Sequence, residues 1–318
     1  MIDEAKAYLA EDWQKFSALL QSSLEARVGL LNQINKYLLE RSGKQLRPLL
    51  CMLAARLCGG ECSESVIRQA ASCEMVHTAT LLHDDVADES SLRRGSPTVS
   101  AMISPTAAVL IGDYWLSRAV DLLTDGGDLE VISYFSSCLN DLAEGEMFQI
   151  EKAAAMDTDY SDYINIITKK TASLFMVAVK SGAHSAGCTP GQFSALCEYA
   201  LNLGLAFQMR DDILDYSPEL ATGKPVMQDV KERKITLPLL GAFGNAGPEA
   251  RSRIVEQIEE GRYEGILEFV RSNGGIDYAQ KVLEEHTEKA VAALAVFEES
   301  PSKALLEALS RQLSFRKI

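Results

Sequence analysis

Apolar residues, mainly leucine and alanine, recur every three or four positions along almost all of the 318 residues. This spacing places them on one face of an α-helix, turn after turn. The alternation of apolar and polar residues that marks a half-buried strand is almost absent. We therefore predict an all-α fold.

Helix-breaking residues divide this pattern in the first third of the chain. A helix is predicted to begin near Leu24 and to end at Ser42-Gly43, because glycine favours a helix end. Pro48 suits the first turn of the next helix, which Gly59-Gly60 would close. Ser104-Pro105 supplies the cap and the first-position proline of a further helix.

Two long helices are expected to carry most of the candidate chemistry. One covers Ser63–Asp88. The other covers Thr189–Tyr216 and starts with the threonine cap, the first-position proline and the glutamine of a capping box. Residues 217–236 turn to Pro, Gly, Lys and Asp, which predicts a long functional loop. No repeat or interdomain linker is seen, so residues 1–318 are expected to form a single domain.

Two clusters of aspartates share one spacing, in which two adjacent aspartates are followed by a third after two other residues. Residues four apart lie on one helix face, so each cluster packs three carboxylates into a narrow arc. Such a group is often only a solvated face, but Leu82 and Phe207 lie close by, and carboxylates beside core positions are costly unless paired or metal-bound. Mg²⁺ prefers carboxylate oxygens and is completed by substrate phosphates. The predicted metal ligands, on two faces that would hold a metal–diphosphate between them, are Asp84, Asp85, Asp88, Asp211, Asp212 and Asp215.

Basic residues accompany both clusters. Those before Pro48 precede a helix whose N-terminal amides would also attract an anion. The arginines after the first cluster have planar forks that suit phosphate oxygens. A single basic residue is most often a surface cation, and it is the joint placement of this set that indicates diphosphate binding. The basic candidates are Lys44, Arg47, His77, Arg93, Arg94, Lys170, Lys224 and Lys234, and the hydroxyl of Thr171 follows Lys170.

Composition restricts the partners. A net charge of −14 disfavours nucleic acid and anionic membrane surfaces, so the basic residues must act locally. The seven cysteines form no C-x-x-C pair and are expected to be reduced. The N-terminus is acidic and amphipathic, unlike a secretory signal, and no apolar run reaches the ~18 residues of a membrane span. We expect a cytoplasmic protein.

The motifs resemble those of the long-chain all-trans polyprenyl diphosphate synthases. They are GK-x-x-RP at 43–48, HTATLLHDD-x-x-D at 77–88, RRG at 93–95, KT at 170–171 and G-x-x-FQ-x-x-DD-x-x-D at 204–215, followed by GK and K-x-TLP. The resemblance is strongest over 42–240, and in the C-terminal helices of 241–318 it is limited to length and helical character. It implies a helical bundle of the isoprenoid-synthase type with a central cavity, and a homodimer.

The resemblance also implies a reaction. A Mg²⁺-dependent enzyme would condense isopentenyl diphosphate with an allylic diphosphate, farnesyl or geranylgeranyl, head to tail. Diphosphate departs, an allylic carbocation forms, the isopentenyl double bond attacks it and a proton is lost. No protein nucleophile is needed. The product is expected to be delivered to a membrane and to serve as a quinone side chain.

The same resemblance assigns roles to individual residues. Asp84, Asp88 and Asp211 would bind Mg²⁺, supported by the other three aspartates. Thr171 and Gln208 would turn oxygen dipoles toward the carbocation. The residues implied for the allylic diphosphate are Arg93, Lys170, Gln208, Lys224 and Lys234, and those for isopentenyl diphosphate are Lys44, Arg47, His77 and Arg94.

The chain departs from the family pattern at two positions. Gln228 and Arg233 stand where the family often has glycine. The geometry of this loop is therefore less firmly implied than its lysines.

The residues just before the first cluster bear on product length. In the family, aromatic side chains at these positions stop chain growth early, whereas Ala79 and Thr80 are small, although ordinary helix packing also favours small residues. Met75 and Val76, one turn further back, are modest in size. Each turn advances ~5.4 Å, roughly one extended isoprene unit, which predicts a product of about C30 or longer. Candidates for the channel floor on an opposing helix are Trp115, Leu116 and Val120.

Four alternatives share some of these features. A phosphohydrolase of the HD type would use His83-Asp84 with His77, but it leaves the second cluster unused. A class I terpene cyclase shares the fold but would carry a different second metal site. A non-catalytic partner subunit would usually have lost an aspartate or arginine that this chain retains. A short-chain synthase, making farnesyl or geranylgeranyl diphosphate, differs only in product length.

Overall fold

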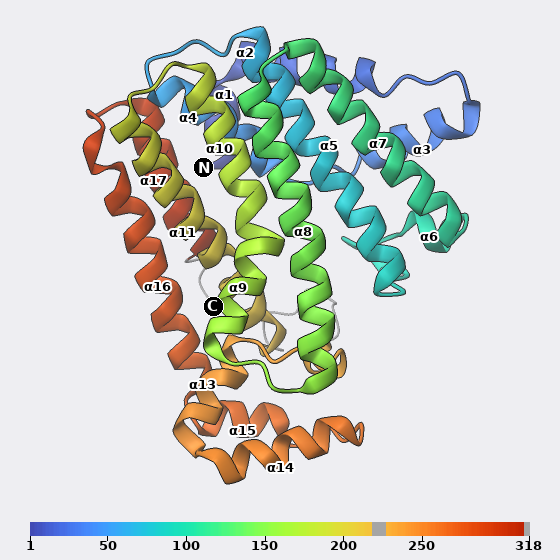
Figure 1. Ribbon diagram of the computed structural model, residues 1–318, viewed down its shortest axis with the longest axis vertical. Coiled ribbons are helices and arrows are strands. Elements are labelled where there is room, and N and C mark those ends of the chain that lie inside the picture. The colour runs from blue at the N-terminus through green and yellow to red at the C-terminus, as the bar shows by residue number, and fades with distance from the viewer. Residues whose placement is uncertain (218–226, 315–318) are drawn as a thin grey trace. The chain divides into compact units, whose positions relative to one another are not determined.

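The computed structural model of the protein describes residues 1–217 and 227–314, and these are helical almost throughout, as predicted (Figure 1). Lys224 lies outside the described residues. No helix in the described ranges combines the length and apolar character needed to cross a bilayer. The chain groups into two compact units, which are described one at a time. The expectation of a single domain stays a prediction.

The first unit comprises residues 1–136, 177–196 and 299–305. The elements that lie wholly in it are α1 (Ile2–Tyr8), α2 (Ala10–Ser23), α3 (Gly29–Leu39), α4 (Leu46–Leu57), α5 (Glu64–Ala87), β1 (Leu92–Arg93), β2 (Ser96–Pro97), α6 (Val99–Met102) and α7 (Pro105–Gly126). The long helix α5 packs against α2, α4 and, most extensively, α7, which runs alongside it in Figure 1. This unit holds the first aspartate cluster.

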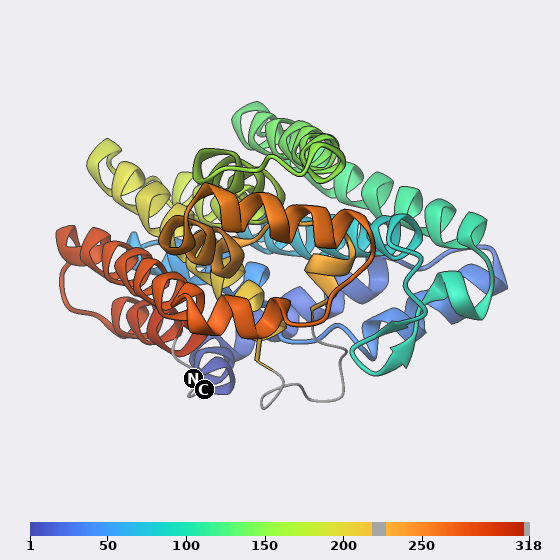
Figure 2. The ribbon, with the colours of Figure 1, turned by 90° about the horizontal axis from the view of Figure 1, so that it is seen from below.

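The second unit comprises residues 137–176, 197–298 and the C-terminal residues from 306. The elements that lie wholly in it are α9 (Tyr160–Ile167), the π-helical turn η1 (Thr168–Ala172), α12 (Gln228–Lys231), α13 (Leu237–Ala246), α14 (Pro248–Glu259), α15 (Ile266–Ser272), α16 (Gly275–Ala293) and the 3₁₀ turn η3 (Leu294–Val296). Helix α13 packs against α14, α15 and α16, all orange to red in Figure 2. Helices α8 (Leu129–Ala155), α10 (Ser173–Ser185), α11 (Pro190–Asp215) and α17 (Pro301–Ser314) contribute residues to both units.

Capping residues begin the two long helices where the sequence predicts. Ser63 precedes α5, and its hydroxyl accepts a hydrogen bond from the Val66 N–H at 3.4 Å. At the start of α11, the Thr189 N–H donates to Gln192 Oε1 at 2.9 Å, and the Gln192 N–H donates to Thr189 Oγ1 at 3.3 Å. This reciprocal pair is a capping box, so both predicted starts are confirmed.

The helix predicted to begin at Leu24 begins instead at Gly29. The Asn32 carboxamide accepts the Ala26 N–H at 2.8 Å and donates to the Ala26 carbonyl at 2.7 Å. Asn35 Nδ2 donates to the Leu24 carbonyl at 2.7 Å. Asparagine side chains that bond nearby backbone compete with helix formation. Two asparagines therefore hold a break that apolar spacing alone does not reveal.

A small hairpin follows α5, although strand signals are almost absent. Strands β1 and β2 pair antiparallel, with Arg93 opposite Ser96. The two residues between the strands, Arg94 and Gly95, have φ of 52° and 75°. A two-residue turn with both φ positive fits the twist of a hairpin. The RRG motif thus forms a tight turn, with arginine in a conformation that glycine prefers.

Glycine and small polar residues bring α5 against α7. A Cβ added to Gly112 would lie 2.2 Å from His83 Nε2, so the imidazole occupies the space that glycine leaves. Ser72 Oγ donates to the Ala119 carbonyl at 3.2 Å. These two contacts place the face of α5 that carries residues 72 and 83 on α7.

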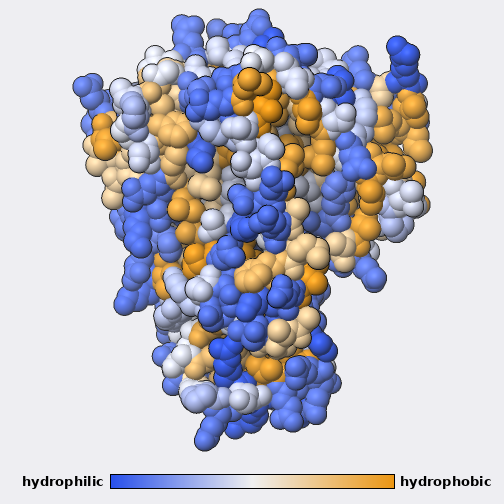
Figure 3. Space-filling model, viewed as in Figure 1, coloured by the Kyte–Doolittle hydropathy of each residue, from blue (hydrophilic) through white to orange (hydrophobic). Residues whose placement is uncertain are grey.

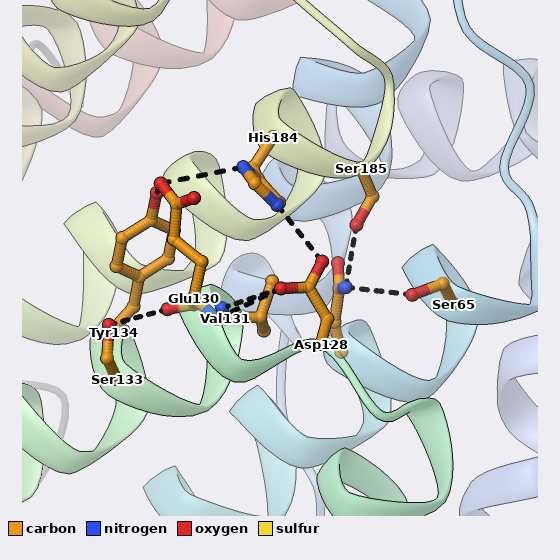
Figure 4. Close-up of polar contacts among 9 residues, drawn as sticks. Ser65, Asp128, Glu130, Val131, Ser133, Tyr134, His184 and Ser185 are labelled. Atoms are coloured by element: carbon orange, nitrogen blue, oxygen red, sulfur yellow. Dashed lines mark hydrogen bonds and ion pairs between the residues drawn. The ribbon is translucent and has the colours of Figure 1, made fainter.

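Polar contacts fasten the start of α8 to α10 in the first unit. Asp128 Oδ1 accepts the Val131 N–H at 3.2 Å, and His184 Nε2 lies 3.0 Å from Asp128 Oδ2 (Figure 4). Gln69 Nε2 of α5 donates to Ser185 Oγ at 2.7 Å. The turn between α7 and α8 is thereby anchored to α10.

Candidate functional site

The first aspartate cluster lies at the end of α5, beside a cavity of about 70 Å³ in the first unit. We name it the Arg94 cavity. Its polar lining consists mainly of Arg41, Glu74, His77, Asp85, Arg93 and Arg94. Three of the residues predicted to bind diphosphate therefore share one cavity with one of the aspartates.

Asp85 is held by an arginine. Its side chain is 4% exposed, and Oδ1 accepts a hydrogen bond from Arg93 Nε at 2.7 Å. Burial raises the pKa of Asp85, while the hydrogen bond from Arg93 acts in the opposite direction. Asp84 is half-buried and Asp88 is exposed. The carboxylates of one motif therefore have different surroundings, and Asp85 is suited to orienting Arg93.

Arg94 connects two of the predicted motifs. Its Nη1 donates to the Arg41 carbonyl at 3.0 Å. The guanidinium also lies over Gly43, where an added Cβ would be 2.4 Å from Nη1. Gly43 has φ of 72°, so both its backbone and the space beside it require glycine. The GK-x-x-RP and RRG motifs therefore meet in space.

His77 is neutral in this cavity. Burial lowers the pKa of His77 well below its ordinary range, and the charges of Arg47, Arg94 and Arg93 lower it further. A neutral imidazole has one N–H donor, so His77 is suited to hydrogen bonding rather than to charge neutralisation. Lys44 is exposed just before α4, and Arg47 is the second residue of that helix.

The second aspartate cluster ends α11, beside a cavity of about 150 Å³ in the second unit. We name it the Asp212 cavity. The predicted site residues that line it are Lys170, Thr171, Gln208, Asp212 and Lys234. The sequence therefore identifies five residues that the fold brings to one cavity.

A chain of hydrogen bonds crosses this cavity. Thr171 Oγ1 donates to Gln208 Oε1 at 2.8 Å, and Gln208 Nε2 donates to Asp212 Oδ1 at 2.8 Å. The Tyr163 hydroxyl donates to Asp212 Oδ2 at 2.6 Å. Burial raises the pKa of Asp212 to about 7, against the effect of these two hydrogen bonds. Gln208 is thereby oriented, with its carbonyl oxygen toward the threonine.

Lys170 and Thr171 lie on the π-helical turn η1, which two glycines allow to form. A Cβ on Gly204 of α11 would lie 2.6 Å from Ala172 Cα, and one on Gly145 of α8 would lie 2.7 Å from Lys169 Cβ. Neighbouring helices therefore approach the turn closely on both sides. Single π-turns occur frequently at functional sites.

Asp215 holds the first residues of α12. Its Oδ1 accepts the Gln228 N–H at 3.0 Å, and its Oδ2 accepts the Asp229 N–H at 3.1 Å. Burial, Asp212 and Asp215 raise the pKa of Asp229 well above its ordinary range, while Lys234 acts in the opposite direction. Asp215 therefore caps α12 and brings Asp229 into the Asp212 cavity.

The departures from the family pattern have a structural counterpart. Arg233, at a position where the family often has glycine, has φ of 59°. Gln228 is preceded by Met227, which has φ of 62°. The left-handed conformation costs an L-residue roughly 1 kcal/mol. At Arg233 the loop thus keeps a conformation that glycine suits, without the glycine, whereas Gln228 is the first residue of α12.

Two lysines predicted to bind diphosphate pair with glutamates. Lys170 forms an ion pair with Glu146 of α8. Lys234 Nζ lies 2.6 Å from Glu232 Oε2. A bound diphosphate would compete with these carboxylates for the ammonium groups.

The aspartate clusters fit a divalent cation by their chemistry. Both present carboxylate oxygens, and Asp84, Asp88 and Asp211 reach solvent. In the described ranges, no group of three or more His, Cys, Asp or Glu residues is arranged to hold a metal ion by itself. Mg²⁺ keeps several waters and takes one or two carboxylates plus substrate phosphates, so a closed protein cage is not required.

The residues predicted to set product length are buried in α5. Met75, Val76 and Ala79 are buried, whereas Thr80 is half-buried and its hydroxyl donates to the His77 carbonyl at 2.8 Å. Residues 72, 76, 79 and 83 share a helix face by spacing, and that face packs on α7.

The floor candidates on α7 differ in exposure. Trp115 is buried, and its Nε1 donates to Asn35 Oδ1 at 2.9 Å. Val120 is 49% exposed and Leu116 is half-buried. Of the three, Trp115 therefore has the fixed and buried side chain that a floor needs.

Sequence reasoning missed Glu74, Glu146, Tyr163 and Asp229. Tyr163 is the most informative omission, because its hydroxyl bonds an aspartate of the second cluster from 49 residues away along the chain. No local spacing connects these two positions. Glu74 alone had a local signal, since it lies one turn before His77 on α5.

Comparison with known proteins places the chain in one family. The sequence model of the family described as Polyprenyl synthetase matches residues 28–269. The octaprenyl diphosphate synthase of Escherichia coli (strain K12) is 37% identical over 314 residues, covering 97% of each chain.

Solved structures agree. The decaprenyl diphosphate synthase of Rhodobacter capsulatus has a TM-score of 0.93 and 34% identity, covering 99% of each chain. The polyprenyl synthase of Caulobacter crescentus CB15, solved with calcium and isoprenyl diphosphate, has a TM-score of 0.91 and 33% identity, covering 100% of this chain and 98% of that one.

The helical fold and its two aspartate clusters define an isoprenoid synthase. Within that class, the chain belongs to the polyprenyl synthetase family. The predicted family, all-α fold and prenyltransferase class are confirmed. The family includes a structure that holds a divalent cation together with an isoprenyl diphosphate.

Proposed function

We propose that the protein is a Mg²⁺-dependent prenyltransferase that condenses isopentenyl diphosphate with farnesyl or geranylgeranyl diphosphate. The product is a long-chain all-trans polyprenyl diphosphate. Its length is about C30 or longer, because each helical turn of ~5.4 Å along α5 matches roughly one extended isoprene unit. The carrying observation is the hydrogen-bonded chain from Thr171 through Gln208 to Asp212, in a cavity that also holds Lys170 and Lys234. The octaprenyl and decaprenyl names of its relatives support the long product.

The roles proposed for the second unit follow from its charges. Lys170 and Lys234 bind the allylic diphosphate, whose oxygens take the place of Glu146 and Glu232. Gln208 is oriented by Asp212 and Thr171, so its dipole is fixed before substrate binds. Such preorganised dipoles stabilise developing charge without reorganisation during the reaction.

The first unit is proposed to supply residues for both substrates. Arg94 and neutral His77 bind isopentenyl diphosphate with Lys44 and Arg47, while Arg93, oriented by Asp85, binds the allylic diphosphate. In this unit Asp84 and Asp88 would hold Mg²⁺, and in the second unit Asp211 would hold Mg²⁺. Bound Mg²⁺ would supply neutralisation of charge on the departing diphosphate.

Incorporation of labelled isopentenyl diphosphate tests this function. Purified protein with farnesyl diphosphate and Mg²⁺ should convert the label into solvent-extractable polyprenyl product. Asp84→Ala should reduce the rate by at least about 100-fold, since a metal ligand acts directly on the leaving group. Asp125→Ala, an exposed aspartate near the end of α7, is the matched control and should retain activity.

The behaviour of the wild-type protein distinguishes a synthase from a non-catalytic partner subunit. If the wild-type protein incorporates no label alone but does so with a second prenyl synthase chain, the non-catalytic partner subunit is correct and the proposal is wrong. If turnover is indifferent to detergent and lipid, delivery of the product to a membrane is not part of the cycle.

We also propose a homodimer, as the family resemblance implies. Exposed apolar side chains at the end of α6 and on α7 support it: Met102 and the following Ile103, then Val109 and Leu110, with Leu110 62% exposed. Figure 3 shows apolar side chains gathered over this region. Light scattering should give twice the chain mass of 34.7 kDa. Leu110→Glu should give monomer, whereas Val296→Glu, at an exposed site on η3, should not.

A further inference from the structure

Glu74 is a buried carboxylate that the proposed function leaves without a role. It lies on α5 one turn before His77, lines the Arg94 cavity and is 2% exposed. Its Oε2 has no hydrogen-bond partner among the described residues. A carboxylate this deeply buried is costly unless charges of opposite sign compensate it.

Basic residues from three separate segments supply that compensation. Burial raises the pKa of Glu74 to about 7, while Arg47, Arg94 and Lys6 act in the opposite direction. Arg94 comes from the hairpin after α5 and Arg47 from α4. Arg47 and Arg94 are among the residues proposed to bind isopentenyl diphosphate. Glu74 therefore interacts with the same basic residues as this substrate would.

Lys6, on the N-terminal helix α1, is the third basic residue that interacts with Glu74. Its Nζ lies 4.5 Å from the centroid of the Trp13 ring, a distance at which the ring attracts the ammonium. Burial lowers the pKa of Lys6, while Asp3 and Glu74 raise it. Helix α1 contacts α4, the helix that carries Arg47. Lys6, which lies outside the span of strongest resemblance, is therefore one of the charges that act on Glu74.

We propose that Glu74 is a positioning residue for isopentenyl diphosphate: its carboxylate orients the basic residues that bind this substrate, and Lys6 belongs to the same charge cluster. The inference rests on the proposed function. Guanidinium groups without a carboxylate between them repel and spread apart, whereas a shared carboxylate holds them in the arrangement that a diphosphate needs. Binding is tighter when the site is ordered beforehand.

Steady-state kinetics with each substrate varied in turn tests the proposal. In Glu74→Gln, which keeps the shape and removes the charge, KM for isopentenyl diphosphate should rise about tenfold, as expected for a lost charge partner. KM for the allylic diphosphate should stay unchanged. Glu74→Asp should recover part of the loss, and Lys6→Met should raise the same KM by a smaller factor. Glu64→Gln, exposed on α5 and paired with Arg68, and Lys15→Met are the controls.

A KM for isopentenyl diphosphate that does not rise would contradict the positioning role. If Glu74 acted only through its charge, removing a negative charge beside an anion site would lower KM for isopentenyl diphosphate. A lowered or unchanged KM in Glu74→Gln, with thermal unfolding showing a folded variant, overturns the proposal. Should that variant fail to fold, Lys6→Met decides, and an unchanged KM there also overturns it.

Calorimetric titration with isopentenyl diphosphate separates this inference from the proposed function. Weaker binding by Glu74→Gln than by the wild type supports the positioning role even where no condensation occurs, and then only the proposed reaction fails. A wild-type protein that does not bind isopentenyl diphosphate overturns the positioning role.

Discussion

Identical residues within each aspartate motif have different surroundings. Asp85 and Asp212, the second aspartate of each motif, are buried and accept hydrogen bonds from Arg93 and from Tyr163, respectively. Carboxylates that are buried and already bonded are poor candidates for direct substrate contact. The spacing of three aspartates predicts a shared helix face, and only the fold divides them into exposed and supporting members.

The hydroxyl of Tyr163 is expected to support catalysis. Tyr163→Phe removes the 2.6 Å hydrogen bond to Asp212, which in turn orients Gln208. A hydrogen bond to a charged group contributes about 1.5–3 kcal/mol, so kcat/KM for the allylic substrate should fall about tenfold or more. KM for isopentenyl diphosphate should not change. Tyr160→Phe, at an exposed position on the same helix, is the control, and equal rates for the two variants would contradict this role.

The buried carboxyl of Glu74 should make stability depend on pH. Its pKa is raised from 4.5 to about 7, so its contribution to folding is fully present below about pH 4.5 and is lost as the pH rises through about 7. In Glu74→Gln this titration is absent. The free energy of unfolding of the wild type should therefore fall relative to the variant between about pH 5 and pH 8, by up to roughly 3 kcal/mol. Denaturant unfolding at several pH values measures this, and a constant difference would rule it out.

At the scale of elements, the close approach of α8 and α11 to the turn η1 positions Lys170 and Thr171. Gly204→Ala would place a Cβ 2.6 Å from Ala172 Cα, so α11 and the π-turn must separate. Overpacking of this kind costs about 1–3 kcal/mol, and it displaces Lys170 and Thr171. Both stability and condensation rate should fall.

Gly191→Ala is the matched control for this substitution. It lies on the same helix, α11, and no atom lies within 4 Å of the added Cβ. The control should be neutral or slightly stabilising, because alanine favours helix. A Gly204→Ala protein as active and as stable as the control would show that the close approach is not needed.

The elements show where sequence reasoning succeeds. Helices α5 and α11 begin directly after their caps Ser63 and Thr189, and such local signals are readable from the sequence alone. The break before Gly29 and the π-turn at Thr168–Ala172 were not predicted. The first depends on asparagine side chains bonding backbone several residues away, and the second depends on glycines of two other helices.

At the scale of the whole molecule, product length is the property that motifs define least. The two aspartate clusters and their basic residues belong to condensation at any length. We expect length to depend instead on the buried residues before the first cluster, where Ala79 lies on the face of α5 that packs on α7. Trp115, fixed by Asn35, is the large buried residue of the facing helix. The long-chain prediction therefore depends on packing between α5 and α7 rather than on the motifs.

Chromatography of the products made from labelled isopentenyl diphosphate and farnesyl diphosphate tests this account most directly. The wild-type protein should give a ladder that ends at one discrete product of about C30 or longer, by the estimate of one isoprene unit per helical turn. Ala79→Phe should end the ladder at or before geranylgeranyl diphosphate, with condensation itself retained. A wild-type ladder that ends at farnesyl or geranylgeranyl diphosphate would contradict the account and favour a short-chain synthase.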